Sequence, residues 1–205
     1  CNEKTAMEEA IGMSFAGKRA MVCMKHVGLN VAADAFINSA ITGANGGLVV
    51  VVADDPSMHS SQNEQDSRFY AQFAQIPYFE PASQQEAYDL TAKAFDISER
   101  HGVPVLIRIT TRMAHSRANV LRRMEKPRDQ NPMRTPADPR QFVLLPAIAR
   151  RNYGRLLQKA GVFIEESEAS EFNALHAGKD RRLGIIACGI AINYVKEVFG
   201  EKGCP

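Results

Sequence analysis

The sequence predicts an α/β fold, a mainly parallel sheet flanked by helices, followed by a linker and the first strand–helix unit of a second α/β domain. Short apolar runs alternate with amphipathic helical segments up to residue 110, which is typical of parallel strands joined by crossover helices. The run 48–52 has five consecutive aliphatic residues, as in a strand buried on both faces. Between 118 and 141 the periodicity stops and four prolines appear, which indicates a linker.

Composition places the chain among ordinary globular proteins. It has 205 residues, of which 45% are hydrophobic and 23% charged, enough to bury a real core. The net charge of +2 is too small to favour a nucleic acid or an anionic membrane as partner. No apolar segment approaches the roughly 20 residues that span a bilayer, and no signal peptide is recognisable. We expect neither a nucleic-acid nor a membrane partner.

The four cysteines, Cys1, Cys23, Cys188 and Cys204, form no C-x-x-C pair. We therefore expect no metal or iron–sulfur ligation within this chain. Cys23 and Cys188 lie in apolar runs and are expected to be buried thiols, which fits a reducing cytoplasm. Both ends of the chain adjoin helical patterns, so we expect it to be cut from a longer protein.

The first elements follow from periodicity and capping residues. Asn2 is a good N-cap for a helix whose stop signal is Gly17. In chain order we expect a helix over 4–16, a strand over 19–24, a turn over 25–28 and a helix over 29–41.

A polar loop follows the central strand 48–52. Ligands of open α/β sheets bind just past the carboxyl ends of such strands. The loop is dense in donors and acceptors: His59, Ser60, Ser61, Gln62, Asn63, Asp66 and Arg68. It is therefore the first candidate for a functional site.

Further elements complete the predicted first domain and begin a second. Ser83 and Glu86 form a capping box for the helix that follows. We expect helices over 68–74, 84–100, 145–170 (with a break near Gly161) and 190–199, and strands over 78–79, 105–109 and 183–188. The predicted domains are 1–117, a linker 118–141, a helical connection 142–182 and the truncated start of a second domain, 183–205.

Several common motifs can be weighed from the residues alone. Gly189 follows a strand, but neither G-x-G-x-x-G nor a P-loop is present. Carboxylates after a strand can bind Mg²⁺, yet adjacent Asp54 and Asp55 should point in different directions, so no metal site is assigned. No G-x-S-x-G frame supports hydrolysis by a serine. Arg68 is either a bidentate carboxylate binder or a solvated surface arginine, and Glu3 alone reads as an ordinary helix start.

Three separated motifs nevertheless occur together: NEKTAMEEAIGMSFAG, MKHVGLNVAAD and NGGLVVVVADDPSMHSSQNEQDSRFYA. In that order they resemble the alpha subunits of indolepyruvate ferredoxin oxidoreductases, which belong to the thiamine-diphosphate-dependent 2-oxoacid:ferredoxin oxidoreductases. The resemblance covers residues 2–116 and returns in LGIIACGIAINYVKE. It implies oxidative decarboxylation of indolepyruvate to an acyl-CoA, with electrons passed to ferredoxin.

The resemblance also implies roles for individual residues. The first domain would receive the aminopyrimidine ring of thiamine diphosphate, and Glu3 occupies the position of the catalytic glutamate that binds ring nitrogen N1′ and promotes the imino tautomer. Such a glutamate is expected in an apolar pocket. The expected cofactor-binding residues are Glu3, Lys25, His26, Gly28 and Asn30, and the expected substrate-binding residues are Ser60, Ser61, Gln62, Asn63 and Arg68.

The sequence departs from the family pattern in two ways. The G-D-G motif for diphosphate and Mg²⁺ is absent, and so are the cysteines for iron–sulfur clusters. We expect both in other parts of the full enzyme, with coenzyme A, ferredoxin, a beta subunit, the remaining alpha-subunit domains and self-association as partners. The chain is expected to be inactive alone.

Three alternatives remain open from the sequence. The first is a sister 2-oxoacid:ferredoxin oxidoreductase of another specificity, such as a branched-chain or pyruvate type. The second is a structural or interaction domain that keeps this fold without a cofactor, in which Glu3 would have no role. The third, and the least favoured, is a metal-dependent hydrolase.

Overall fold

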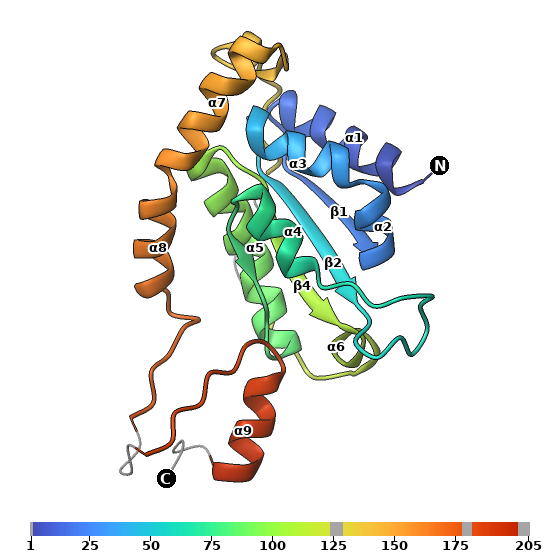
Figure 1. Cartoon of the computed structure of the whole chain (residues 1–205), viewed down its shortest axis with the longest axis vertical. Coiled ribbons are helices and arrows are strands. Elements are labelled where there is room, and N and C mark those ends of the chain that lie inside the picture. Colours follow the sequence, from blue (N-terminus) through green and yellow to red (C-terminus); the bar gives the residue numbers. More distant parts are fainter. Residues whose placement is uncertain (1, 124–128, 178–181, 201–205) are drawn as a thin grey trace.

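The computed structural model describes residues 2–123, 129–177 and 182–200. A parallel sheet in the order β1-β2-β4-β3 lies between helices (Figure 1). Its strands are β1 (Ala20–Lys25), β2 (Leu48–Asp54), β3 (Tyr78–Phe79) and β4 (Val105–Thr110). The predicted α/β class with parallel pairing is confirmed.

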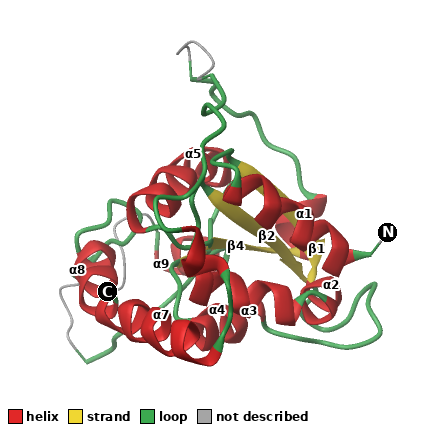
Figure 2. Ribbon diagram, turned by 90° about the horizontal axis from the view of Figure 1, so that it is seen from above, coloured by secondary structure: helices red, strands yellow, loops and turns green. Residues whose placement is uncertain are grey.

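Helices join the strands and continue beyond the sheet. They are α1 (Glu3–Phe15), α2 (His26–Val31), α3 (Ala33–Thr42), α4 (Ser67–Ala74), α5 (Gln84–His101), α6 (Thr111–His115), the 3₁₀ helix η1 (Pro139–Phe142), α7 (Pro146–Gln158), α8 (Ala160–Glu168) and α9 (Ala191–Phe199). Figure 2 shows α5 on one side of the sheet and α3 and α4 on the other. Among the described residues, no helix is long and apolar enough to cross a bilayer.

Strand β2 is the centre of the core. Leu48 and Val50, 1% and 0% exposed, belong to the cluster that contains Phe36 of α3, whereas Val49 packs with Ala94 of α5. Because side chains alternate along a strand, an all-aliphatic run can fill both faces. The strand predicted from that run is therefore confirmed, and it extends to Asp54.

Strand β1 is an edge strand with one covered face. Val22 and Met24 are buried, while Met21 is 50% exposed and the thiol of Cys23 is also exposed. The prediction of a buried Cys23 is wrong, because helix α5 contacts β2 and β4 and leaves this face of β1 open. Cys188 is exposed as well, contrary to prediction. Cys1 and Cys204 lie outside the described residues.

The predicted helix caps are present with one change. The side chain of Asn2 accepts a hydrogen bond from the backbone N–H of Thr5 at 3.1 Å. Ser83 accepts one from the N–H of Glu86 at 3.2 Å. The Glu86 carboxylate bonds the N–H of Ala82 at 2.7 Å, one residue earlier than a capping box requires.

Two predicted helices are each divided. Helix α2 begins at His26, so the turn predicted over 25–28 is wrong, and α3 follows from Ala33. The predicted helix 145–170 consists of α7 and α8, which meet at Lys159 and not at Gly161. The Lys159 ammonium bonds the carbonyl oxygen of His101 at the end of α5, a tertiary contact that helical periodicity does not reveal.

The segment 183–188 is not a strand, contrary to prediction. Its Ile186 side chain is 97% exposed. A strand needs a neighbour to take its backbone hydrogen bonds, and the described residues supply none to this segment. Helix α9 follows as predicted, and residues 201–205 lie outside the described part of the chain.

The described residues of the predicted linker are irregular until η1 begins at Pro139, but they pack back against the first domain. The N–H of Arg134 donates to the carbonyl of Ala16 at 2.9 Å. The Asn131 amide donates to Glu99 at 2.6 Å. Pro127 lies outside the described residues.

Glu99 of α5 joins this linker to the start of β1. Arg19 donates to its two carboxylate oxygens at 2.9 and 2.7 Å. These bonds, with a smaller contribution from Asn131, hold the pKa of Glu99 down, at about 2. A carboxylate with a depressed pKa stabilises the fold fully above its ordinary pKa and loses that contribution as the pH falls through the depressed value.

We therefore predict that Glu99→Gln lowers the free energy of unfolding by about 1–3 kcal/mol at pH 7, the usual loss for hydrogen bonds to a charged group. The difference from the wild type should shrink as the pH falls from about 4.5 towards 2. Urea unfolding at a series of pH values measures it. Glu8→Gln, which removes an exposed pair with Lys4 at 3.8 Å, is the control and should change little. A Glu99→Gln deficit that does not depend on pH contradicts the prediction.

Candidate functional site

The polar loop follows the carboxyl end of β2, and the carboxyl end of β4 lies beside it. Helix α2 and the polar loop between β2 and α4 meet at this edge of the sheet (Figure 1). Parallel strands end at a common edge, which is where α/β proteins bind ligands.

Glu3 and Gly28, predicted from two separate motifs, are in direct contact. Glu3 is the first residue of α1 and is half-buried, and Gly28 is buried in α2. A Cβ atom on Gly28 would lie 2.5 Å from Cγ and 3.0 Å from Oε1 of Glu3. The missing side chain of Gly28 therefore makes room for the glutamate. Part of Glu3 remains exposed, so the glutamate is not enclosed in this structure.

Lys25 and His26 bind the polar loop. His26 is fully buried, with Nε2 3.0 Å from the carbonyl oxygen of Asn63 and Nδ1 3.4 Å from that of Ala53. The Lys25 ammonium donates to the carbonyl oxygen of Ser60 at 3.1 Å. These two predicted site residues thus hold the loop against the start of α2.

Asp55 secures the same loop from its other end. Its carboxylate, 1% exposed, accepts bonds from the N–H of Ser60 and the hydroxyl of Thr111, both at 2.7 Å. The bond from Ser60, and then that from Thr111, hold the pKa of Asp55 far below its usual range. Ser57 and Met58 adopt left-handed φ angles of 67° and 54°. The loop is thus a folded element, tied down at several points.

Asp54 and Asp55, the carboxylates considered from the sequence as Mg²⁺ ligands, are engaged in other interactions. Asp54 accepts from the N–H of Ser67 at 3.0 Å and from Nε of Arg108 at 2.5 Å. Asp55 is committed to the loop. Within the described ranges, no group of three His, Cys, Asp or Glu side chains is arranged to hold a metal ion.

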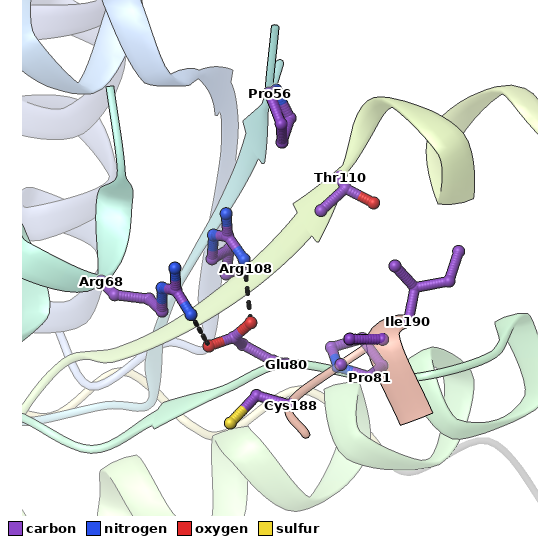
Figure 3. A pocket seen from close by; sticks show the side chains of 10 residues that line it. Pro56, Arg68, Glu80, Pro81, Arg108, Thr110, Cys188 and Ile190 are labelled. Atoms are coloured by element: carbon purple, nitrogen blue, oxygen red, sulfur yellow. Dashed lines mark hydrogen bonds and ion pairs between the residues drawn. The ribbon is translucent and has the colours of Figure 1, made fainter. Parts of the chain in front are cut away.

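Arg108 is the centre of a charged cluster. It belongs to β4, and its side chain is 10% exposed. Besides Asp54 it binds Glu80 at 2.8 Å, and Glu80 lies 3.6 Å from the guanidinium of Arg68 (Figure 3). Asp66 accepts from Nε and Nη2 of Arg68 at 2.9 and 2.5 Å, which raises the pKa of Arg68 above its usual value. Arg68 is thus paired with carboxylates, although its side chain remains 39% exposed.

A pocket of about 220 Å³ borders this cluster. Its wall contains Arg68, Glu80, Arg108, Thr110, two prolines and the turn from Cys188 to Ala191 (Figure 3). The Cβ position of Gly189 lies 3.3 Å from the Glu80 carboxylate. The Glu80 side chain therefore lies against this turn, where a phosphate would have to sit, and its charge is paired with Arg108 and Arg68.

The predicted site residues fall into three sets. Glu3, Lys25, His26 and Gly28 gather around α2. Ser60, Ser61, Gln62 and Asn63 belong to the tied loop, where all but Ser61 are exposed, and Asn30 is exposed on α2. Arg68 lies beside β3 and β4, on the other side of β2 from the first set.

Glu80 and Arg108 of the cluster were not named from the sequence, and Asp66 was named only as a member of the polar loop, without a role. Arg108 had a signal in the sequence, because it interrupts the apolar strand VLIRIT. A buried arginine requires carboxylates nearby. The sequence does not say which carboxylates these are, since Asp54 is 54 positions away.

Residues 1–176 match the family described as pyruvate flavodoxin/ferredoxin oxidoreductase, thiamine diphosphate-binding. Curated relatives share the name indolepyruvate oxidoreductase subunit IorA. The chain is 48% identical to that of Pyrococcus abyssi over 98% of its own length and 32% of the relative's. For Thermococcus kodakarensis the values are 45%, 98% and 32%, and for Methanothermobacter marburgensis 43%, 98% and 33%. The chain thus spans about a third of the length of these relatives.

A solved structure has a similar fold. It is the 2-oxoglutarate:ferredoxin oxidoreductase of Magnetococcus marinus, with a TM-score of 0.55 over 80% of this chain and 36% of that one. The sequence identity is 14%, so the likeness concerns the fold alone.

The Glu3–Gly28 contact yields a prediction about stability. Gly12, in α1, has nothing within 4 Å of its Cβ position, so Gly12→Ala should stabilise the protein by about 0.5–1 kcal/mol, the helix preference for alanine. Gly28→Ala should show no such gain, because its methyl group meets Glu3. In a Glu3→Ala background the gain should return. Urea unfolding of the purified protein measures all four variants, and equal gains from Gly12→Ala and Gly28→Ala in the wild-type background contradict the contact.

Proposed function

We propose that this chain is the part of an indolepyruvate:ferredoxin oxidoreductase that receives the aminopyrimidine ring of thiamine diphosphate. The chain belongs to the pyruvate flavodoxin/ferredoxin oxidoreductase family, whose description is thiamine diphosphate-binding. The observation that carries this proposal is the contact between Glu3 and Gly28, which presents a carboxylate at the ligand-binding edge of the sheet. A domain without a cofactor has no need of that arrangement.

The residues at this edge fit one part of the cofactor. Gly28 leaves room for the Glu3 side chain, and Glu3, which is partly exposed, would be open to a ring nitrogen. Lys25 and His26 lie at the start of the same helix, α2, and Asn30 lies near its end. The described residues contain no group of metal-ligating side chains for Mg²⁺, so the diphosphate end is assigned to another domain.

Thiamine diphosphate, when bound, supplies the electron sink that stabilises the carbanion left when a 2-oxoacid loses CO₂. Glu3 would hold a proton at the ring nitrogen and so act as the general acid–base group of this chain. Arg68 would bind the carboxylate of the 2-oxoacid. The polar loop, held by Lys25 and His26, would help to exclude water.

The positions of Glu3 and Arg68 agree with separate tasks. Glu3 contacts α2, which follows β1, whereas Arg68 pairs with Glu80, which follows β3. In the order β1-β2-β4-β3 these strands are three spacings apart, about 14 Å at the usual strand separation.

The remaining parts of the proposal concern the whole enzyme. The curated relatives are about three times as long as this chain and are named as subunits. We propose that further alpha-subunit domains, a beta subunit and self-association complete the site, with coenzyme A and ferredoxin as reaction partners and iron–sulfur clusters elsewhere. The free thiols of Cys23 and Cys188 support a reducing cytoplasm.

The test is Glu3→Gln in the complete two-subunit enzyme. We predict that thiamine-diphosphate-dependent reduction of a dye by indolepyruvate, with coenzyme A present, falls at least about 100-fold, the usual contribution of a positioned proton-transfer group. The neutral amide cannot share the proton at the ring nitrogen.

Glu9→Gln is the matched control, since Glu9 is exposed on the same helix, and it should keep wild-type activity. Full activity in Glu3→Gln would overturn the role of Glu3. A wild-type enzyme that oxidises other 2-oxoacids but not indolepyruvate would retain the family chemistry and change the substrate.

A further inference from the structure

Asp66 performs two tasks with one carboxylate. As the N-cap of α4, it accepts a hydrogen bond from the backbone N–H of Arg68 at 3.0 Å. It also accepts from the Arg68 side chain, at 2.9 and 3.0 Å from Nε and 2.5 Å from Nη2. The start of the helix and the direction of the guanidinium are therefore fixed by the same residue.

The hydrogen bonds from the Arg68 side chain to Asp66, called the clamp from here on, leave some N–H groups of the guanidinium free to bind a ligand. Arginine has five N–H donors, and Asp66 takes those of Nε and one of Nη2. Glu80 approaches Nη1 only to 3.6 Å. Among the described residues, the remaining Nη hydrogens have no closer acceptor, and Arg68 lines the pocket of about 220 Å³. A carboxylate in that pocket would find a guanidinium already oriented.

Asp66 is itself held by the buried cluster. Its Oδ1 lies 3.7 Å from Nε of Arg108, whose other partner Asp54 is 1% exposed. The hydrogen bonds from Arg68 hold the pKa of Asp66 below its usual value, so the clamp is charged at neutral pH. Arg68 is thus connected to Arg108 of β4 through two carboxylates, those of Asp66 and Glu80.

We propose that Asp66 is a positioning residue for recognition of the 2-oxoacid carboxylate, because it fixes the Arg68 guanidinium at the mouth of this pocket. The inference rests on the proposed function. Asp66 acts through Arg68 and does not itself touch the substrate.

Two effects of Asp66 oppose each other. Its negative charge repels a substrate anion, so loss of charge alone would strengthen binding. Because Asp66 already orders the flexible Arg68 side chain, substrate binding costs less conformational entropy, so loss of the clamp weakens binding. The sign of the change in substrate affinity therefore separates orientation from simple repulsion.

The test is Asp66→Asn in the complete two-subunit enzyme. Asparagine caps helices as well as aspartate, so the thermal midpoint should stay within about 2 °C. We predict that KM for indolepyruvate rises about 5- to 20-fold while kcat stays within about 2-fold, the pattern for lost ground-state binding. In an Arg68→Lys background, which lacks the planar fork, Asp66→Asn should add less than about 2-fold to KM.

Asp138→Asn is the matched control. Asp138 also caps a helix, accepting from the N–H of Arg140 at 3.2 Å, and also pairs with an arginine, Arg151, at 3.5 Å. It lies outside the candidate site, at η1. Its amide variant should keep the wild-type KM.

A KM that falls or does not change in Asp66→Asn overturns the proposal, as does a full additional increase in the Arg68→Lys background. If the asparagine variant does not fold, Asp66→Ser keeps a capping oxygen and is judged by the same criteria. Loss of activity in Glu3→Gln with a wild-type KM in Asp66→Asn would overturn this inference alone. Full activity in Glu3→Gln would overturn the proposed function itself.

Discussion

The charge of Arg108 organises the ligand-binding edge of this domain. A guanidinium at the end of a buried strand is costly unless carboxylates and hydrogen bonds compensate for the lost water. Asp54 and Glu80 do so at 2.5 and 2.8 Å. Asp54 in turn receives the N–H of Ser67 and so fixes where α4 begins. The position of Arg68 follows from that helix start.

These interactions of the carboxylates also determine what the carboxyl-terminal end of the sheet can bind. Carboxylates that compensate an arginine and receive backbone N–H groups are not free to ligate a metal. What remains open is Glu3 on one side of β2 and the outer end of Arg68 on the other. A proton-sharing carboxylate and a carboxylate-binding arginine are the two groups that a ring nitrogen and a 2-oxoacid require. We therefore propose that the chain provides part of a site whose remaining components lie in other domains.

The sequence predicted the elements whose signals are local. Strand β2 followed from its aliphatic run, and α5 from its capping residue and periodicity. Gly28 was misread as a turn, because its small size serves a contact with Glu3, 25 positions earlier. Cys23 was misplaced because burial of a strand depends on which helices cover it. The segment 183–188 has the composition of a strand but finds no neighbour to pair with.

The candidate site residues remain predictions, and the structure adds how they are arranged. The resemblance supplied Glu3, Gly28 and Arg68, and the structure brings the first two into contact. The pairing of Arg68 with Glu80 was not predictable, since Glu80 follows β3 and is shared with Arg108 of β4. The clamp by Asp66 is local, but sequence alone could not distinguish it from an ordinary N-cap.

The most direct measurement is a crystal or cryo-electron-microscopy structure of the complete two-subunit enzyme with thiamine diphosphate bound. If the proposed role is correct, a Glu3 carboxylate oxygen will lie about 2.6–3.2 Å from the N1′ nitrogen of the aminopyrimidine ring, the range for proton sharing. A ring bound elsewhere, or one whose N1′ is paired with a different carboxylate, would contradict it.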